Sequence, residues 1–267
     1  MDARMLLAIA EAVVDDCEKE FLAGLGVAER VAKGPYDFAT TADLKIELML
    51  RRELTTMTGI PVYGEEGGGS LDDPVVWVVD PIDGTSNYAA GNPMCAILVS
   101  LLHQGRPIVA LCSLPTMGKR LTAFEGSPLM INGKPQPKLR TPVPQLVQIG
   151  LGSQIAIDSE TPQLALRREL MADLVRSHTR LRVTGSVGVD TAFTALGIFA
   201  GSVTFSPFAW DNAAGVLLVQ AAGGTATDLE GKPWQPHSVG LVVGAKNIHR
   251  EILATINQIC DEEEYKA

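Results

Sequence analysis

The segment VVWVVDPIDGTSNY, residues 75–88, guides the interpretation of the whole sequence. Its apolar, β-branched start predicts a buried strand that ends at Asp80, because Pro81 has no N–H to donate to a sheet. A turn is expected at Asp83, and Thr85 can begin a helix. Two carboxylates would then lie at the end of a strand, beside unpaired N–H groups at the start of a helix. Such a pair suits a hard cation that holds a phosphate.

Each of the acidic residues at such positions also has an ordinary structural interpretation. Asp80 can cap a turn, and Asp83 can belong to a simple Asp-Gly turn. Asp211, in FAWDNAAG, can be the N-cap of an Ala-rich helix, and Asp43 lies in the first turn of another predicted helix. The segment GEEGGG at 64–69 can be a solvated loop. Four acids at the ends of elements, each flanked by Gly or Thr, nevertheless suggest a shared site.

The overall charge excludes several classes of partner. The 267 residues include 22 Lys and Arg against 31 Asp and Glu, which gives a formal charge of −9. Nucleic acid and anionic membrane surfaces are therefore poor partners, because both are bound through clustered Lys and Arg. We expect no signal peptide and no membrane span, since no apolar run approaches about 18 residues. Four widely spaced cysteines predict reduced thiols in a cytoplasmic protein.

Predicted helices and strands alternate along the chain, which indicates an α/β fold, with more α+β character in the first half. Prolines concentrate between 128 and 144, and this segment is the expected seam between two subdomains, 1–140 and 141–267, of one catalytic unit. Helices are expected at 6–21, 41–58, 161–178, 189–199, 211–222 and the C-terminus. Strands are expected at 60–63, 75–79, 94–102, 107–112, 147–152, 180–185, 203–206 and 240–245.

Several other motifs are excluded by their spacing. Ile82 and Gly84 break the alternate acids of an EF-hand loop that starts at Asp80. An aspartyl-phosphate phosphatase would need a second Asp in place of Ile82. The sequence contains no phosphate-binding loop of the G-x-x-x-x-G-K-[ST] type, no G-x-S-x-G and no HExxH. Nucleotide hydrolysis by a P-loop and serine or zinc hydrolysis are therefore not supported.

Five short motifs together resemble the inositol monophosphatase family, the Mg²⁺-dependent sugar phosphatases that are typically inhibited by lithium. They are TTADLKIE at 40–47, GEEG at 64–67, DPIDGTSNY at 80–88, TGSVGVD at 184–190 and WDNAAG at 210–215. The resemblance spans about residues 5–255. It implies the layered α-β-α-β-α sandwich of that family, with the metal site between the two subdomains, and a homodimer.

The resemblance also implies roles for individual residues around two to three Mg²⁺ ions. It implies that the metal ligands are Glu65, Asp80, the carbonyl of Ile82, Asp83 and Asp211. It implies that the substrate is bound by Asp83, Gly84, Thr85, Gly185, Ser186 and Asp211. It implies that the catalytic residues are Asp43, Glu65 and Thr85. In this set Asp80 is shared between the first and second ions, and Thr85 with Asp43 orients or activates the attacking water.

The substrate implied by the resemblance is a small phosphorylated polyol, first of all myo-inositol monophosphate. Histidinol phosphate, fructose 1,6-bisphosphate and 3′-phosphoadenosine 5′-phosphate stay open as alternatives, and a non-catalytic binding or regulatory role is a remote one. Thr204 stands where inositol-selective members commonly carry an acid, which weakens the inositol assignment. Phe205 and Phe208 can be core residues or a pocket wall, and Val187 replaces a frequently small residue.

Overall fold

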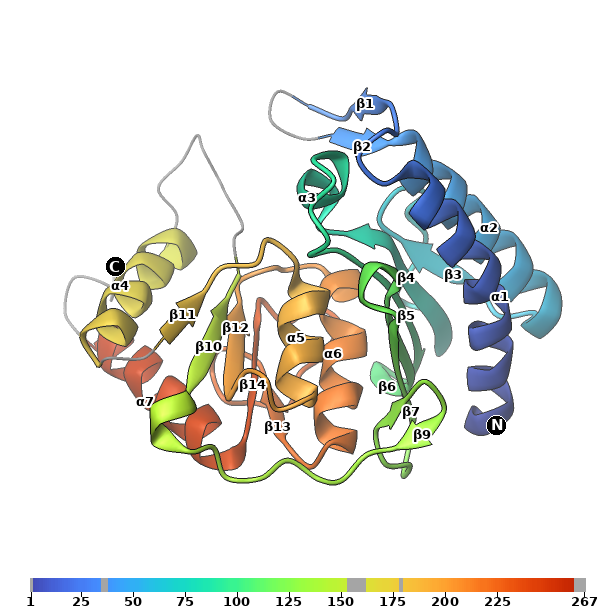
Figure 1. The fold of residues 1–267 in the computed structure, drawn as a ribbon. Helices are drawn as coiled ribbons and strands as arrows, with labels where there is room; N and C mark the ends of the chain where they lie inside the picture. The colour runs from blue at the N-terminus through green and yellow to red at the C-terminus, as the bar shows by residue number, and fades with distance from the viewer. Residues whose placement is uncertain (1, 35–37, 153–161, 178–179, 262–267) are drawn as a thin grey trace.

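The computed structural model describes residues 2–34, 38–152, 162–177 and 180–261. These residues form five layers in the order helices, sheet, helices, sheet, helices (Figure 1). The seven-stranded sheet comes from the first half of the chain, and the five-stranded sheet from the second. The layered α-β-α-β-α architecture expected from the sequence is therefore confirmed.

Seven α-helices are assigned among the described residues, in three pairs and one short single turn. Their bounds are α1 (Ala3–Gly24), α2 (Thr41–Thr58), α3 (Thr85–Ala89), α4 (Pro162–Arg176), α5 (Val187–Ala195), α6 (Ala209–Ala221) and α7 (Lys246–Asp261). Helices α1 and α2 cover the outer face of the larger sheet, and α4 and α7 cover the outer face of the smaller one. Helices α5 and α6 lie between the sheets and contact both.

The seven-stranded sheet has the order β3-β4-β5-β6-β7-β8-β9. Its strands are β3 (Val62–Gly64), β4 (Val75–Asp83), β5 (Ala96–His103), β6 (Arg106–Leu114), β7 (Lys119–Phe124), β8 (Met130–Ile131) and β9 (Lys134–Pro135). Only the pairing of β3 with β4 is parallel. The hairpin expected around His103-Gln-Gly-Arg is confirmed as β5 and β6.

The five-stranded sheet has the order β11-β10-β12-β14-β13. Its strands are β10 (Gln148–Leu151), β11 (Arg180–Arg182), β12 (Gly201–Thr204), β13 (Thr225–Thr227) and β14 (Leu241–Gly244). A small separate hairpin pairs β1 (Arg30–Ala32) with β2 (Phe38–Thr40), and two 3₁₀ turns lie at Pro115–Met117 and Pro144–Leu146. The proline-rich segment carries the chain from the first sheet to the second along the lower edge of Figure 1.

Three apolar cores hold the five layers together. The first lies between the seven-stranded sheet and α1 with α2, and includes Phe21, Leu50 and Trp77. The second joins the same sheet to α5 and α6. The third lies between the five-stranded sheet and the pair α4 and α7. The first and second halves of the chain thus share the middle core, because helices from the second half pack on a sheet from the first.

Helix α2 begins and ends as its sequence predicts. Thr40 is the N-cap, and the side chain of Asp43 accepts a hydrogen bond from the Thr40 N–H to complete a capping box. Gly59 ends the helix in the left-handed conformation, with a φ of 69°, which glycine adopts without strain. These signals fix the helix register, and with it the positions of the buried acids Asp43 and Glu47.

Two local expectations are wrong. Strand β4 does not end at Asp80 but continues to Asp83, with an irregularity in the pairing to β5 between these two residues. Pro81 cannot donate to the ladder, so pairing breaks at a bulge and resumes two residues later. Helix α6 begins at Ala209 with Phe208 as its N-cap, so Asp211 is not a cap but the third residue of the helix.

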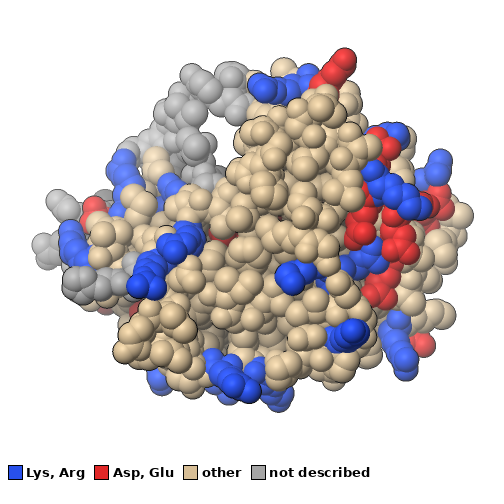
Figure 2. Space-filling model, in the orientation of Figure 1, with Lys and Arg blue, Asp and Glu red and all other residues tan. Residues whose placement is uncertain are grey.

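Charged side chains are unevenly spread over the surface. Figure 2 shows acidic and basic side chains mixed over the side formed by α1 and α2, with fewer charges over the centre of this face. Ion pairs there include Lys19 with Asp16 and Lys45 with Glu20. None of the helices in the described part of the chain combines the length and the apolar character that a bilayer-spanning segment needs.

Replacing Leu50 by Ala should lower the free energy of unfolding by about 2–5 kcal/mol, because the side chain is fully buried between α2 and the sheet. Leu48→Ala on the same helix is the matched control, since Leu48 is 65% exposed and its loss should cost about 0.5 kcal/mol or less. Urea unfolding measures both. Equal losses of unfolding free energy in the two variants would contradict the assignment of Leu50 to the buried face of α2 and Leu48 to its exposed face.

Candidate metal centre

Three carboxylates meet between the two sheets. Asp80 and Asp83 lie at the end of β4, and Asp211 lies in the first turn of α6. Each offers an oxygen atom, and these atoms all lie within 4.8 Å of one another. They line a cavity of about 730 Å³. The structure thus brings together three of the acids that the sequence singled out, from segments far apart in the chain.

Burial and mutual repulsion raise the pKa values of this cluster. The pKa of Asp80 lies well above its ordinary value, first because of burial and then because of the negative charges of Glu65, Asp83 and Asp211. Burial and the charge of Asp83 raise the pKa of Asp211 to about 8. Such crowded hard oxygen donors are the chemistry that Mg²⁺ or Ca²⁺ prefers, so the residues present fit a divalent cation.

The carboxylate of Asp83 is also bound to the start of α5. It accepts hydrogen bonds from the Gly188 N–H at 2.7 Å, the Val187 N–H at 3.1 Å and the Ser186 hydroxyl. These bonds oppose the effect of burial, and the pKa of Asp83 is raised only to about 6. One acid of the cluster therefore joins the strand of the first half to a helix of the second.

The segment around Gly84 packs closely against the one around Ser186. Gly84 has a φ of 85°, and a Cβ there would lie 3.1 Å from the Cβ of Ser186 and 3.2 Å from the carbonyl oxygen of Gly185. The side-chain amide of Asn87 in α3 donates to the Thr184 carbonyl at 2.8 Å. Gly84 is therefore required by its backbone conformation and by the close approach. The two segments that the resemblance assigns to substrate binding lie side by side.

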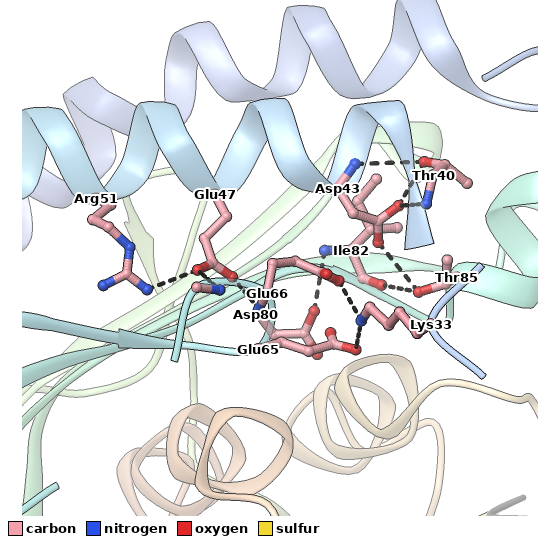
Figure 3. A network of polar contacts seen from close by, with 11 residues as sticks. Lys33, Thr40, Asp43, Glu47, Arg51, Glu65, Glu66, Asp80, Ile82 and Thr85 are labelled. Carbon is pink, nitrogen blue, oxygen red and sulfur yellow. Dashed lines mark hydrogen bonds and ion pairs between the residues drawn. The ribbon is translucent and has the colours of Figure 1, made fainter. Parts of the chain in front are cut away.

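Thr85, the first residue of α3, contacts the carboxylate of Asp43 (Figure 3). Its Oγ1 lies 3.2 Å from Asp43 Oδ1 and 3.1 Å from the Ile82 carbonyl oxygen. The other oxygen of Asp43 accepts hydrogen bonds from the N–H and hydroxyl of Thr40. Burial raises the pKa of Asp43, and these bonds oppose that shift. Asp43 is thus a buried acceptor held in one orientation toward Thr85.

Glu65 lies in the same cavity but outside the group of three close carboxylates. Lys33, just after β1, places its Nζ 3.1 Å from Glu65 Oε1 and 2.6 Å from Glu66 Oε1 (Figure 3). Burial raises the pKa of Glu65 to about 7, although the charge of Lys33 opposes the shift. Burial lowers the pKa of Lys33, but its bonds to the two glutamates outweigh that effect and leave it raised.

Sequence reasoning missed three residues of this network, namely Lys33, Glu47 and Arg51. Glu47 lies in the quoted TTADLKIE motif but was given no role. It is buried, and its carboxylate accepts hydrogen bonds from the backbone of the loop that carries Glu65. Nothing in the local sequence around Lys33 points to the site, because the β1–β2 hairpin brings it there only in the folded chain.

The remaining wall of the cavity is more apolar than the metal cluster. Phe208 lines the cavity, is 42% exposed and stacks on Trp210 with 4.6 Å between ring centroids. Phe205 is 4% exposed and belongs to the core. Thr204 and Val187 also line the cavity. Of the two alternatives for the phenylalanines, the core is therefore correct for Phe205 and the pocket wall for Phe208.

Three comparisons with known proteins identify the family of this chain. The sequence profile of the inositol monophosphatase family matches residues 3–261. The inositol-1-monophosphatase ImpA of Mycolicibacterium smegmatis is 44% identical over 97% of this chain and 95% of its own length. The inositol monophosphatase of Thermotoga maritima superposes with a TM-score of 0.83, at 24% identity, over 98% of this chain and 99% of that structure.

A solved inositol monophosphatase/NADP phosphatase, complexed with Mg²⁺ and phosphate, also shares the fold. Its TM-score is 0.80 at 20% identity, over 96% of this chain and 97% of that one. The profile match covers nearly the whole sequence, and the relative from M. smegmatis is similar over nearly its whole length. This chain belongs to the inositol monophosphatase family.

Proposed function

We propose that this protein is a Mg²⁺-dependent phosphomonoesterase that hydrolyses a small phosphorylated polyol, with myo-inositol monophosphate as the leading substrate. The observation that carries the proposal is the cluster of Asp80, Asp83 and Asp211, within 4.8 Å of one another in a cavity of about 730 Å³. Membership of the family and the 44% identity to an enzyme named inositol-1-monophosphatase support it.

Two to three Mg²⁺ ions are proposed to bind to the acidic wall of the cavity. The first would be held by Glu65, Asp80 and the carbonyl of Ile82, and the second by Asp80, Asp83 and Asp211. Glu65 would share a weaker third ion. Bound ions neutralise charge on a phosphate and make a nearby water more acidic. Lys33, which pairs with Glu65 in this structure, would have to give up that contact for the first ion.

The phosphate is proposed to lie against the backbone N–H groups of Gly84 and Thr85. Asp83 and Asp211 also face this cavity, and Gly185 with Ser186 forms the wall beside Gly84. The close packing of the two glycine-containing segments keeps this wall fixed. A fixed set of donors stabilises charge without reorganising during the reaction, which is the usual source of catalytic electrostatics.

Thr85 and Asp43 are proposed to orient the attacking water. The Thr85 hydroxyl lies 3.2 Å from Asp43, which can hold its proton, so that the Thr85 oxygen can accept a hydrogen bond from water. Asp43 is itself fixed by Thr40 and is buried. The reaction is expected to proceed by direct attack of water, because no candidate nucleophilic side chain lies in the motif.

Four further properties are part of the proposal, of which the first two rest on the resemblance and the other two on the cysteines and the proline-rich segment of the sequence. They are inhibition by lithium, a homodimeric state, a cytoplasmic location and a division into subdomains 1–140 and 141–267. All four cysteines are free thiols, three of them buried, which supports a reducing compartment. The change of sheet between β9 and β10 supports the division. Titration of the activity with lithium tests the inhibition, and the native mass tests the homodimeric state.

The test of the function is phosphate release from four substrates with and without Mg²⁺. The panel is myo-inositol 1-phosphate, histidinol phosphate, fructose 1,6-bisphosphate and 3′-phosphoadenosine 5′-phosphate. We expect Mg²⁺-dependent release, fastest from the inositol ester. Faster release from histidinol phosphate or the nucleotide would instead indicate that Phe208 and Thr204 bind a substrate ring that carries few hydroxyl groups. Release from none of them would overturn the enzyme proposal in favour of a binding role.

Asp211→Asn should reduce turnover to less than a tenth of the wild-type rate at saturating Mg²⁺, because the amide removes a charged ligand from the cluster. The melting temperature should be nearly unchanged. Asp83→Asn should lose turnover equally, but should also have a lower melting temperature, since Asp83 accepts hydrogen bonds from the first two N–H groups of α5. Asp16→Asn, on the exposed side of α1, is the control. Retention of more than a tenth of the rate in Asp211→Asn would contradict the two-ion assignment.

Thr85→Ala should lower kcat by about 100-fold or more with little change in KM, because the hydroxyl acts on water rather than on ground-state binding. Thr85→Ser keeps the hydroxyl and should restore most of the rate. Steady-state kinetics at saturating Mg²⁺ distinguish the two parameters. A change confined to KM would remove Thr85 from the chemical step.

A further inference from the structure

The loop that carries Glu65 is wrapped around the carboxylate of a residue on another element. Glu47 of α2 is 2% exposed. Its Oε2 accepts a hydrogen bond from the Glu66 N–H at 2.6 Å, and its Oε1 accepts one from the Gly67 N–H at 2.7 Å. Both oxygens of one buried carboxylate are therefore used to hold successive N–H groups of the Glu65–Gly67 loop.

The glycines of the loop are the residues that allow this approach. A Cβ at Gly64 would lie 2.6 Å from the carboxyl carbon of Glu47, and a Cβ at Gly67 would lie 2.8 Å from its Oε1. At such distances something has to shift, and the atoms in the way are the ends of the Glu47 and Arg51 side chains, which are held by hydrogen bonds. The lack of a side chain at these two positions therefore lets the loop close on Glu47 while the carboxylate keeps both of its backbone hydrogen bonds.

Arg51 supplies the positive charge that Glu47 needs. Its Nη2 donates to Glu47 Oε1 at 2.7 Å (Figure 3). The same Nη2 donates to the Gly68 carbonyl at 3.0 Å, and Nη1 donates to the Val62 carbonyl at 2.6 Å. The guanidinium thus ties the strand before the loop to the residue after it. Glu47 has its own counter-charge and does not depend on a cation in the cavity.

The placement of Glu47 on α2 connects this loop to the rest of the site. Glu47 lies one turn after Asp43, so both side chains project from the same face of the helix. Asp43 contacts Thr85, and Glu47 contacts the loop of Glu65. One rigid helix therefore sets the position of the Glu65 loop relative to the end of β4, where Asp80 lies.

We propose that Glu47 is a positioning residue for the metal centre, which sets the affinity for Mg²⁺ by fixing the backbone that carries Glu65. This inference rests on the proposed function, in which Glu65 binds the first ion. Glu47 touches neither substrate nor ion and acts through two backbone hydrogen bonds. Groups that orient metal ligands in this way typically contribute 10- to 100-fold to affinity.

The test is the binding of Mg²⁺ to metal-stripped protein, without substrate, by titration calorimetry. Glu47→Gln can offer only one acceptor oxygen, and its amide N–H₂ would face a backbone N–H or Arg51. The dissociation constant for Mg²⁺ should rise by about 10-fold or more. The Mg²⁺ concentration for half-maximal activity should rise similarly, with kcat at saturating Mg²⁺ and KM for the phosphate ester within threefold of wild type.

Glu53→Gln is the matched control, because it removes the same charge from a partly exposed position on the same helix. It should leave Mg²⁺ affinity within twofold of wild type. Gly67→Ala is the second variant, used whether or not Glu47→Gln folds. Its Cβ would force apart the loop and the ends of Glu47 and Arg51 that hold it, while the carboxylate is kept. It should weaken Mg²⁺ binding as Glu47→Gln does, and the double variant should show less than the summed effect.

The outcomes separate this inference from the proposed function. If wild type binds Mg²⁺ and Gly67→Ala or a folded Glu47→Gln binds it within twofold as tightly, the positioning role is overturned. A lower melting temperature with unchanged Mg²⁺ affinity has the same meaning, because it marks a purely structural role. If the wild-type protein shows no Mg²⁺ binding, the proposed function is overturned, and the positioning role of Glu47, which rests on it, is overturned as well.

Discussion

Three carboxylates that lie within 4.8 Å of one another in a protein interior repel each other strongly and need a counter-charge. The chain supplies part of it from its own groups. Asp83 accepts bonds from the start of α5, Glu65 and Glu66 pair with Lys33, and Glu47 pairs with Arg51. Asp80 and Asp211 keep the most strongly raised pKa values of the cluster. The remaining deficit of positive charge is the property that makes this cavity a place for divalent cations, inside a chain of net charge −9.

The fold is arranged so that this crowding can be tolerated. Asp83 and Asp211 lie at the ends of elements, where backbone N–H groups are available, and Asp80 lies beside the bulge that interrupts the pairing of β4. Helices α5 and α6 are packed between the sheets, so their first turns face the end of β4. The middle core is shared by both halves of the chain. The candidate metal centre is therefore assembled from parts that only the complete five-layer structure brings together.

Much of the fold and part of the candidate site could be predicted from the sequence, because they depend on local signals. The cap at Thr40, the glycine at 59 and the apolar run at 75–79 determine their elements with little outside help. The acids 80, 83 and 211 were found because their motifs are distinctive. The continuation of β4 past Pro81 was missed, since a bulge depends on the partner strand. Lys33 and the contacts of Glu47 were missed for a similar reason, since both act across segments that approach only after folding.

The contact between Glu47 and the glycines of its loop also has a consequence for how such a sequence can diverge. The carboxylate occupies the volume that a Cβ at position 64 or 67 would need, so a side chain at either position would push the end of Glu47 away from the loop. A descendant that shortened residue 47 would leave the loop N–H groups and Arg51 without their acceptor. We therefore expect four positions to covary, namely 47, 51, 64 and 67. Related sequences should keep all four residues or replace them together.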